Sequence, residues 1–169
     1  NSTYSSKDYI SVFHGWIQNK DIPDHLLIDV ADYSHVIDGP GIILVAHEGH
    51  FSLDQEKNKP GIMYMRKINS VGDFEDRFNQ VFSIALHSMN LLIKEQLDFY
   101  QNSFRFIAND RRLAENTAEN KNLYKNTINS ILKKKFPMES WDFNEISETN
   151  ERLAFTVDFV SGLNIISKK

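Results

Sequence analysis

Apolar side chains recur at three- and four-residue spacing in three segments of the chain, and this spacing predicts three amphipathic helices. The first helix covers residues 9–17, the second extends from Asp73 to Ile93, and the third is capped at Asn116 and extends to Leu132. Lys133–Lys135 follow the third helix, where cations interact favourably with the partial negative charge of a helix C-terminus.

Shorter segments that are rich in β-branched and aromatic residues predict six strands. These strands lie at residues 26–33, 42–48, 62–67, 104–108, 141–145 and 153–159. Asp38–Gly41 has the composition of a turn between the first two strands. The stretches 49–61 and 108–116 have no periodicity, so we expect surface loops there.

The predicted element order is α-β-β-β-α-β-α-β-β. Strands in local hairpins, with helices between groups of strands, favour an α+β fold with a mainly antiparallel sheet and helices packed on one face. We expect a single globular domain over residues 1–169. The last strand alternates most regularly and lies near the C-terminus, so we expect it at an open edge of the sheet.

Composition excludes several classes of function. The 169 residues include no cysteine, which rules out a cysteine nucleophile, a thiolate metal site and a disulfide framework, and favours the cytoplasm. Nineteen basic and 23 acidic residues give a net charge of −4, so we expect no nucleic-acid partner. The longest apolar run, Gly41–Ala46, is far too short to span a membrane, and none is expected as a partner. The chain begins with Asn1 instead of Met, as expected for a processed product.

The candidate catalytic residues are Asp29, His47 and Glu48. If the turn of the first hairpin is centred near Asp38, Asp29 lies opposite Ala46 or His47, and a carboxylate beside an imidazole is a common proton-transfer pair. A register slip of one residue would replace His47 by Glu48 and place two carboxylates together, which is also a catalytic arrangement. A purely structural role for Asp29 is the alternative to both.

Arg111 and Arg112 form the candidate anion site. They follow the strand that ends near Ala108 and precede the helix capped at Asn116, so guanidinium groups and free helix amides would open toward one loop. The alternative is a turn in which the side chain of Asp110 satisfies its neighbours.

No metal or other cofactor is expected. The motif from His47 to His50 is rich in ligand-type side chains, but it lacks the helical spacing of a His-Glu-x-x-His zinc site. In an extended strand, neighbouring side chains point to opposite faces and cannot converge on one ion.

One sequence pattern links several of these segments. It consists of Leu27–Val36, Gly39–Gly41, His47-Glu48 and Arg66-Lys67, with Phe13–Ile17 before it and Asn109–Arg111 and Asn116-Thr117 after it. The pattern resembles that of an uncharacterised bacterial protein family, a domain of unknown function, over about residues 10–135. The resemblance implies a shared fold and a bacterial source, and it implies no activity, ligand or partner.

Twelve Phe, six Tyr and two Trp are more aromatic surface than one small core accommodates. We therefore expect a small soluble binding or assembly domain that forms a homo-oligomer and has a site for an apolar or anionic small molecule. The alternative is a hydrolase or isomerase that uses Asp29 and His47 as an acid–base pair, with or without a metal.

Overall fold

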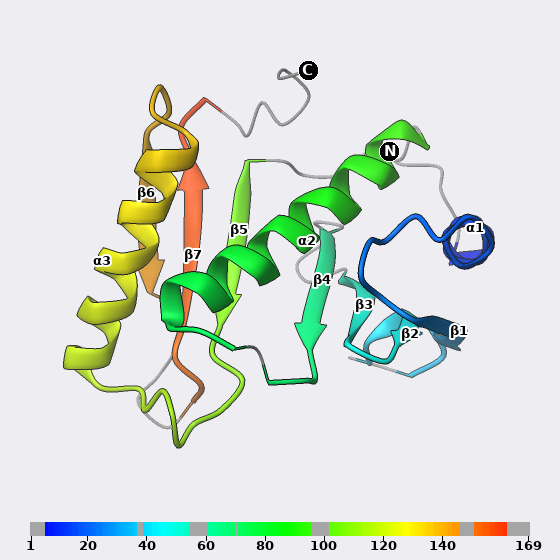
Figure 1. The fold of residues 1–169 in the computed structure, drawn as a ribbon, viewed down its shortest axis with the longest axis horizontal. Helices are drawn as coiled ribbons and strands as arrows, with labels where there is room; N and C mark the ends of the chain where they lie inside the picture. Colours follow the sequence, from blue (N-terminus) through cyan, green and yellow to red (C-terminus); the bar gives the residue numbers. More distant parts are fainter. Residues whose placement is uncertain are drawn as a thin grey trace. The chain divides into compact units, whose positions relative to one another are not determined.

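Two antiparallel sheets organise the chain in the computed structural model, shown as a ribbon in Figure 1. The chain divides into two compact units, Asn1–Tyr100 and Gln101–Lys169, and each unit has its own sheet. The single domain expected over residues 1–169 stays a prediction. The structure describes residues 6–36, 39–54, 61–69, 71–95, 102–145 and 151–161.

The first unit contains a four-stranded meander and two helices. Its strands pair in the order β1-β2-β3-β4, and every pair is antiparallel. Its elements are α1 (Ser6–Asn19), β1 (Leu27–Tyr33), β2 (Gly41–Ala46), β3 (Gly49–Asp54), β4 (Gly61–Arg66) and α2 (Phe74–Lys94). The α+β class and the order of the expected elements are confirmed, and β3 is an additional strand.

Strand β3 lies where the sequence predicts a surface loop, so this expectation is wrong for Gly49–Asp54. The segment does alternate in character, because the apolar side chains of Phe51 and Leu53 are buried on one face while the polar side chains of His50 and Ser52 lie on the other, where Ser52 is also buried. Four alternating residues after a glycine give only a weak strand signal. The pairing with β2 and β4 supplies the stabilisation that the local sequence lacks.

The core of the first unit lies on one face of this sheet. Leu44, Phe51 and Tyr64 are direct partners across β2, β3 and β4, so their side chains share a face. Helices α1 and α2 cover that face. The buried cluster is Tyr9, Phe13, Trp16, Ile22, Ile42, Leu44, Ala46, Phe51, Leu53, Tyr64 and Leu92.

The second unit packs one helix on a three-stranded sheet. Its elements are β5 (Ser103–Ile107), α3 (Ala118–Lys135), β6 (Trp141–Glu145) and β7 (Ala154–Phe159), and the strand order is β5-β7-β6. Helix α3 begins after Thr117, whose hydroxyl oxygen accepts a hydrogen bond from the Asn120 N–H at 3.2 Å. The predicted cap at Asn116 is therefore one residue too early.

Strand β7 is the central strand of its sheet, so the expectation of an open edge there is wrong. Phe155 and Val157 are completely buried between β5 and β6. The pronounced alternation of this strand reflects pairing on both sides, and it gives no surface for self-association. The expected homo-oligomer stays a prediction, but a strand at an open edge of the sheet no longer supports it.

Among the helices that the structure describes, none is long and apolar enough to cross a membrane.

Gly49 provides a test of how the first unit is packed. A Cβ atom there would lie 2.7 Å from Tyr64 Cε2 and 2.7 Å from the Met65 carbonyl oxygen, which is rigid backbone. We expect Gly49→Ala to lower the free energy of unfolding by about 1–3 kcal/mol in chemical denaturation. The control is Gly15→Ala in α1, where no atom lies within 4 Å of the new Cβ and the substitution should raise stability by about 0.5–1 kcal/mol. Equal effects of the two substitutions would contradict this packing.

Candidate functional site

His47 and Glu48 form the turn between β2 and β3. The Glu48 carboxylate accepts a hydrogen bond from the Leu26 N–H at 2.8 Å, and its other oxygen lies 3.3 Å from His47 Nδ1. The His47 N–H donates to the Leu26 carbonyl at 2.9 Å, and the Glu48 carbonyl accepts from the Lys67 N–H at 2.9 Å. Hydrogen bonds from this turn, which joins β2 to β3, therefore connect it to the residue before β1 and to the residue after β4.

Opposing effects act on the pKa of Glu48. Desolvation works to raise it, while hydrogen bonds from the Leu26 N–H, from its own N–H and from His47 stabilise the carboxylate. The net result is that the pKa of Glu48 lies below its usual value. A carboxylate with these donors is a poor general base, and the arrangement has the character of a structural turn.

Asp29 does not join this group. The register places Asp29 opposite Val45, because an irregularity between Leu27 and Asp29 shifts the pairing of β1 with β2. The Asp29 carboxylate accepts a hydrogen bond from the Val30 N–H at 2.7 Å. Among the described residues, none of its hydrogen bonds reaches His47, which is 64% exposed in the turn. The structure thus brings His47 and Glu48 together and places Asp29 opposite Val45, and a catalytic role for these residues stays a prediction.

His25 and Tyr64 form a hydrogen-bonded pair that the sequence did not indicate. His25 Nδ1 lies 2.8 Å from the Pro23 carbonyl oxygen and His25 Nε2 lies 2.8 Å from the Tyr64 hydroxyl. A carbonyl only accepts, so Nδ1 carries a proton, and in this tautomer Nε2 accepts from the Tyr64 hydroxyl. Burial, together with the charge of Glu48, holds the pKa of Tyr64 above its usual value despite the opposing charge of Arg66.

The ring of Tyr64 also completes an aromatic cluster. Its centroid lies 4.7 Å from that of Phe51 and 5.4 Å from that of His25. Tyr64 is 8% exposed, so a substrate has little access to its hydroxyl. The pair joins the segment before β1 to β4, and its chemistry is that of an interior hydrogen bond.

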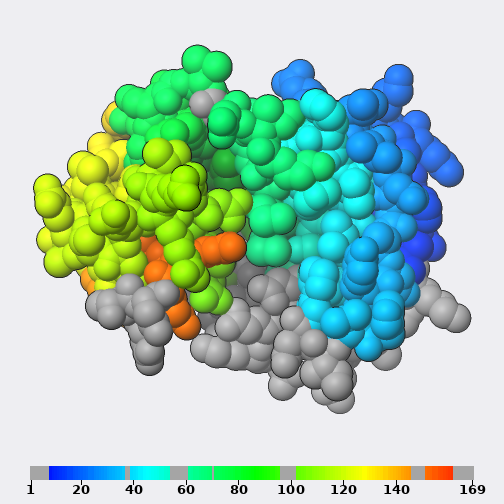
Figure 2. All heavy atoms as spheres, turned by 90° about the horizontal axis from the view of Figure 1, so that it is seen from below, coloured from blue at the N-terminus to red at the C-terminus, as the bar shows by residue number. Residues whose placement is uncertain are grey.

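Arg111 and Arg112 are exposed in the loop after β5, which is yellow-green at the surface in Figure 2. The Asp110 carboxylate accepts from the Arg112 N–H at 2.7 Å and from the Leu113 N–H at 3.4 Å, which is the turn that the sequence left as the alternative. At the start of α3, Thr117 already satisfies the Asn120 amide. The anion site stays a prediction, and one of the helix amides it would use has a partner.

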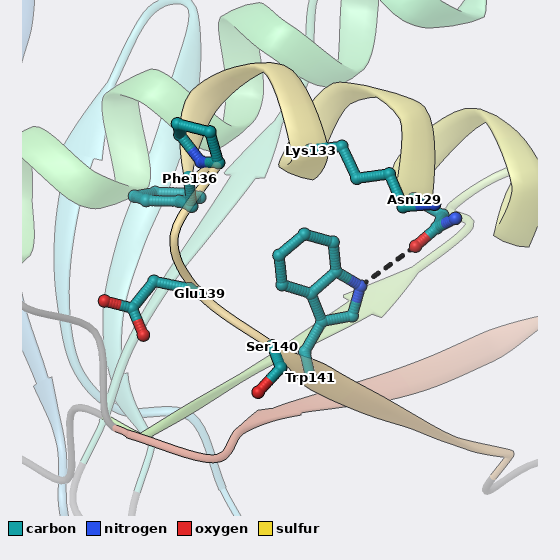
Figure 3. Close-up of a pocket in the computed structure, with 7 residues that line it drawn as sticks. Asn129, Lys133, Phe136, Glu139, Ser140 and Trp141 are labelled. Carbon is teal, nitrogen blue, oxygen red and sulfur yellow. Dashed lines mark hydrogen bonds between the residues drawn. The ribbon is translucent and has the colours of Figure 1, made fainter.

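The second unit has a groove at the end of α3, shown in Figure 3. Its volume is about 480 Å³, and it lies between the last two turns of the helix and the segment that leads into β6. Its lining residues are Asn129, Lys133, Phe136, Pro137, Glu139, Ser140 and Trp141. The sequence named Trp141 only as a strand residue, and aromatic content was the single signal for a site of this kind.

Trp141 is the centre of the groove. Its indole Nε1–H donates to Asn129 Oδ1 at 3.1 Å, and its ring lies 5.7 Å from that of Phe159. Figure 3 shows the indole between Glu139 on one side and Lys133 and Asn129 on the other. One buried oxygen of Glu139, Oε2, has no hydrogen-bond partner. The groove thus combines an anchored aromatic ring with flanking groups of opposite charge.

Metal-ligating side chains do not gather in threes anywhere in the described ranges.

Comparison with known proteins gives no relative from which a role could be transferred: no family model, no curated protein and no solved structure matches the chain. The resemblance to a family of unknown function therefore stays a prediction, and the geometry carries the functional argument.

Glu48→Gln tests the charged turn. Because the pKa of Glu48 is lowered in the folded state, its stabilisation is present above the unfolded pKa and is lost as the pH falls through the folded value. We expect Glu48→Gln to cost up to about 1 kcal/mol at neutral pH, and the difference from wild type to shrink as the pH falls below about 4.3, the pKa of an unperturbed Glu side chain. Denaturation curves over this pH range measure it. The matched control is Glu151→Gln, an exposed residue whose substitution should change stability little at either pH.

Tyr64→Phe tests the interior hydrogen bond. The variant leaves His25 Nε2 without its donor, which should lower the free energy of unfolding by about 1 kcal/mol at neutral pH. Because the pKa of Tyr64 is raised in the folded state, its stabilisation is present below the unfolded value and is lost as the pH rises through the folded value. The gap between wild type and variant should therefore narrow above about pH 10. A constant gap across that range would contradict the interpretation.

Proposed function

We propose that this protein is a small-molecule binding module whose site is the groove at the end of α3. Pockets for small ligands have volumes of about 300–1,000 Å³ and combine apolar walls with a few polar groups. The groove has this size, at about 480 Å³, and its apolar lining residues are Phe136, Pro137 and Trp141. The ligand it suits is compact, with a planar apolar face that can contact an aromatic ring.

The observation that carries the proposal is the fixed indole of Trp141. A tryptophan offers a large apolar surface, and its single donor usually finds a partner when it is buried. Here Asn129 holds that donor and Phe159 supports the ring, so the ring is oriented before any ligand arrives. A site oriented in advance loses less conformational entropy on binding.

The acid–base alternative has weaker support. It requires Asp29 beside His47, and the described hydrogen bonds of these two residues go to different partners, Val30 and Glu48. We therefore propose binding in preference to hydrolysis or isomerisation.

Naphthalene-2-carboxamide, a neutral planar compound, tests the groove. Its binding should shift the NMR signal of the Trp141 indole Nε1–H, while the signal of Trp16, which is 2% exposed in the other unit, should stay in place. Trp141→Leu should weaken binding about tenfold, measured by the fluorescence anisotropy of the compound, because the aromatic contact is lost.

Tyr33→Leu is the control for this experiment, since Tyr33 is an exposed aromatic residue of the first unit outside the groove. It should leave the affinity unchanged. Binding that survives Trp141→Leu, or no binding of the compound at all, would contradict the proposed site.

A further inference from the structure

We propose that the groove selects a planar ligand with one carboxylate, held by Lys133 and Asn129. This inference rests on the proposed function, because it names the chemistry of the ligand for the same groove. It depends on the polar groups around Trp141 and on how their hydrogen-bonding capacity is used.

Asn129 has an amide N–H group that could donate to a ligand. An indole N–H only donates, so the atom of Asn129 that faces Trp141 is the carbonyl oxygen Oδ1, and the amide nitrogen points elsewhere. Among the described residues, none accepts a hydrogen bond from Asn129 Nδ2. The hydrogen bond between Trp141 and Asn129 therefore orients both the indole ring and the Asn129 amide group.

Lys133 supplies the charge. Residues four positions apart lie on the same face of a helix, so Lys133 and Asn129 are neighbours on α3. Figure 3 shows both on the same side of the indole. Lys133 is exposed and forms no ion pair within the described ranges. An ammonium group and an amide N–H beside an aromatic ring are complementary to a carboxylate on a planar body.

Glu139 limits the ligand to one negative charge. It lines the groove on the opposite side of the indole with its carboxylate directed away from the ring, and its negative charge disfavours a second carboxylate of the ligand on that side. The two ends of the groove therefore differ in sign. A ligand should bind in one direction, with its carboxylate toward Lys133.

The end of α3 could favour a cation instead, because a helix C-terminus carries roughly half a negative charge. Three consecutive lysines, Lys133–Lys135, occupy this last turn and exceed that partial charge several-fold. The balance of charge at the helix end of the groove is positive, and this supports the choice of an anion.

Three naphthalene compounds of the same shape test the charge preference: naphthalene-2-carboxylate, its neutral carboxamide, and 2-naphthylmethylammonium. We expect the carboxylate to bind about fivefold more tightly than the carboxamide, and the ammonium compound most weakly. The Trp141 indole Nε1–H signal reports binding of all three. Equal affinities, or tighter binding of the ammonium compound, would overturn this inference and leave the binding groove itself intact. Binding of none of them would overturn the proposed function.

Lys133→Gln should reduce the affinity for the carboxylate to that of the carboxamide and leave the carboxamide unaffected. Lys135→Gln is the matched control, because it removes the same charge from the same turn but does not line the groove. An equal loss in both variants would show a diffuse effect of charge and overturn the role of Lys133.

Glu139→Gln should improve the binding of naphthalene-2,6-dicarboxylate about fivefold and have a smaller effect on the binding of the monocarboxylate. If the substitution changed the affinities for the two compounds equally, the role of Glu139 would be overturned.

Discussion

The contact between the Tyr64 ring and the backbone at Gly49 is the constraint on which the first unit depends. Only a residue without a side chain lets the ring lie this close to β3, and the ring then reaches both Phe51 and His25. The Tyr64 hydroxyl is hydrogen-bonded to His25 in the segment before β1. In the adjacent turn, the Glu48 carboxylate accepts a hydrogen bond from the N–H of the next residue, Leu26. One glycine thus permits the packing that joins three strands and a loop.

Local patterning was sufficient to predict the helices and most strands, because α2 and β7 keep the 3.6- and 2-residue periods over their whole length. It was insufficient for β3, whose few alternating residues depend on partners on both sides. It also missed that Ala46 ends β2, so that His47 and Glu48 form a turn. Division into two sheets follows from which strands pair, and this is information that no single segment contains.

The candidate sites show the same limit more sharply. Pairing Asp29 with His47 required a regular hairpin, and one irregularity in β1 was enough to remove the match. His25 and Tyr64 are 39 residues apart in the sequence and have no local signal that relates them. The aromatic content predicts an apolar site, and the groove in which we propose it depends on the Asn129–Trp141 hydrogen bond, which exists only in the folded second unit. The sequence indicated the residue types, and only the fold determines which of them come into contact.

The hydrogen bond within β1 has a consequence for behaviour at high protein concentration. β1 is an outer strand of its sheet in which Ile28 is 55% exposed, and Leu26, just before the strand, is 64% exposed; an outer strand with exposed apolar residues can pair with a strand of another molecule. The Asp29 carboxylate accepts from the Val30 N–H within the strand, and the Asp32 carboxylate accepts from the Ser34 N–H just after it. A strand from a second molecule would have to displace these carboxylates or bury their charge. The carboxylate of Asp29, which invited a catalytic interpretation, therefore opposes the addition of another strand at this edge of the sheet.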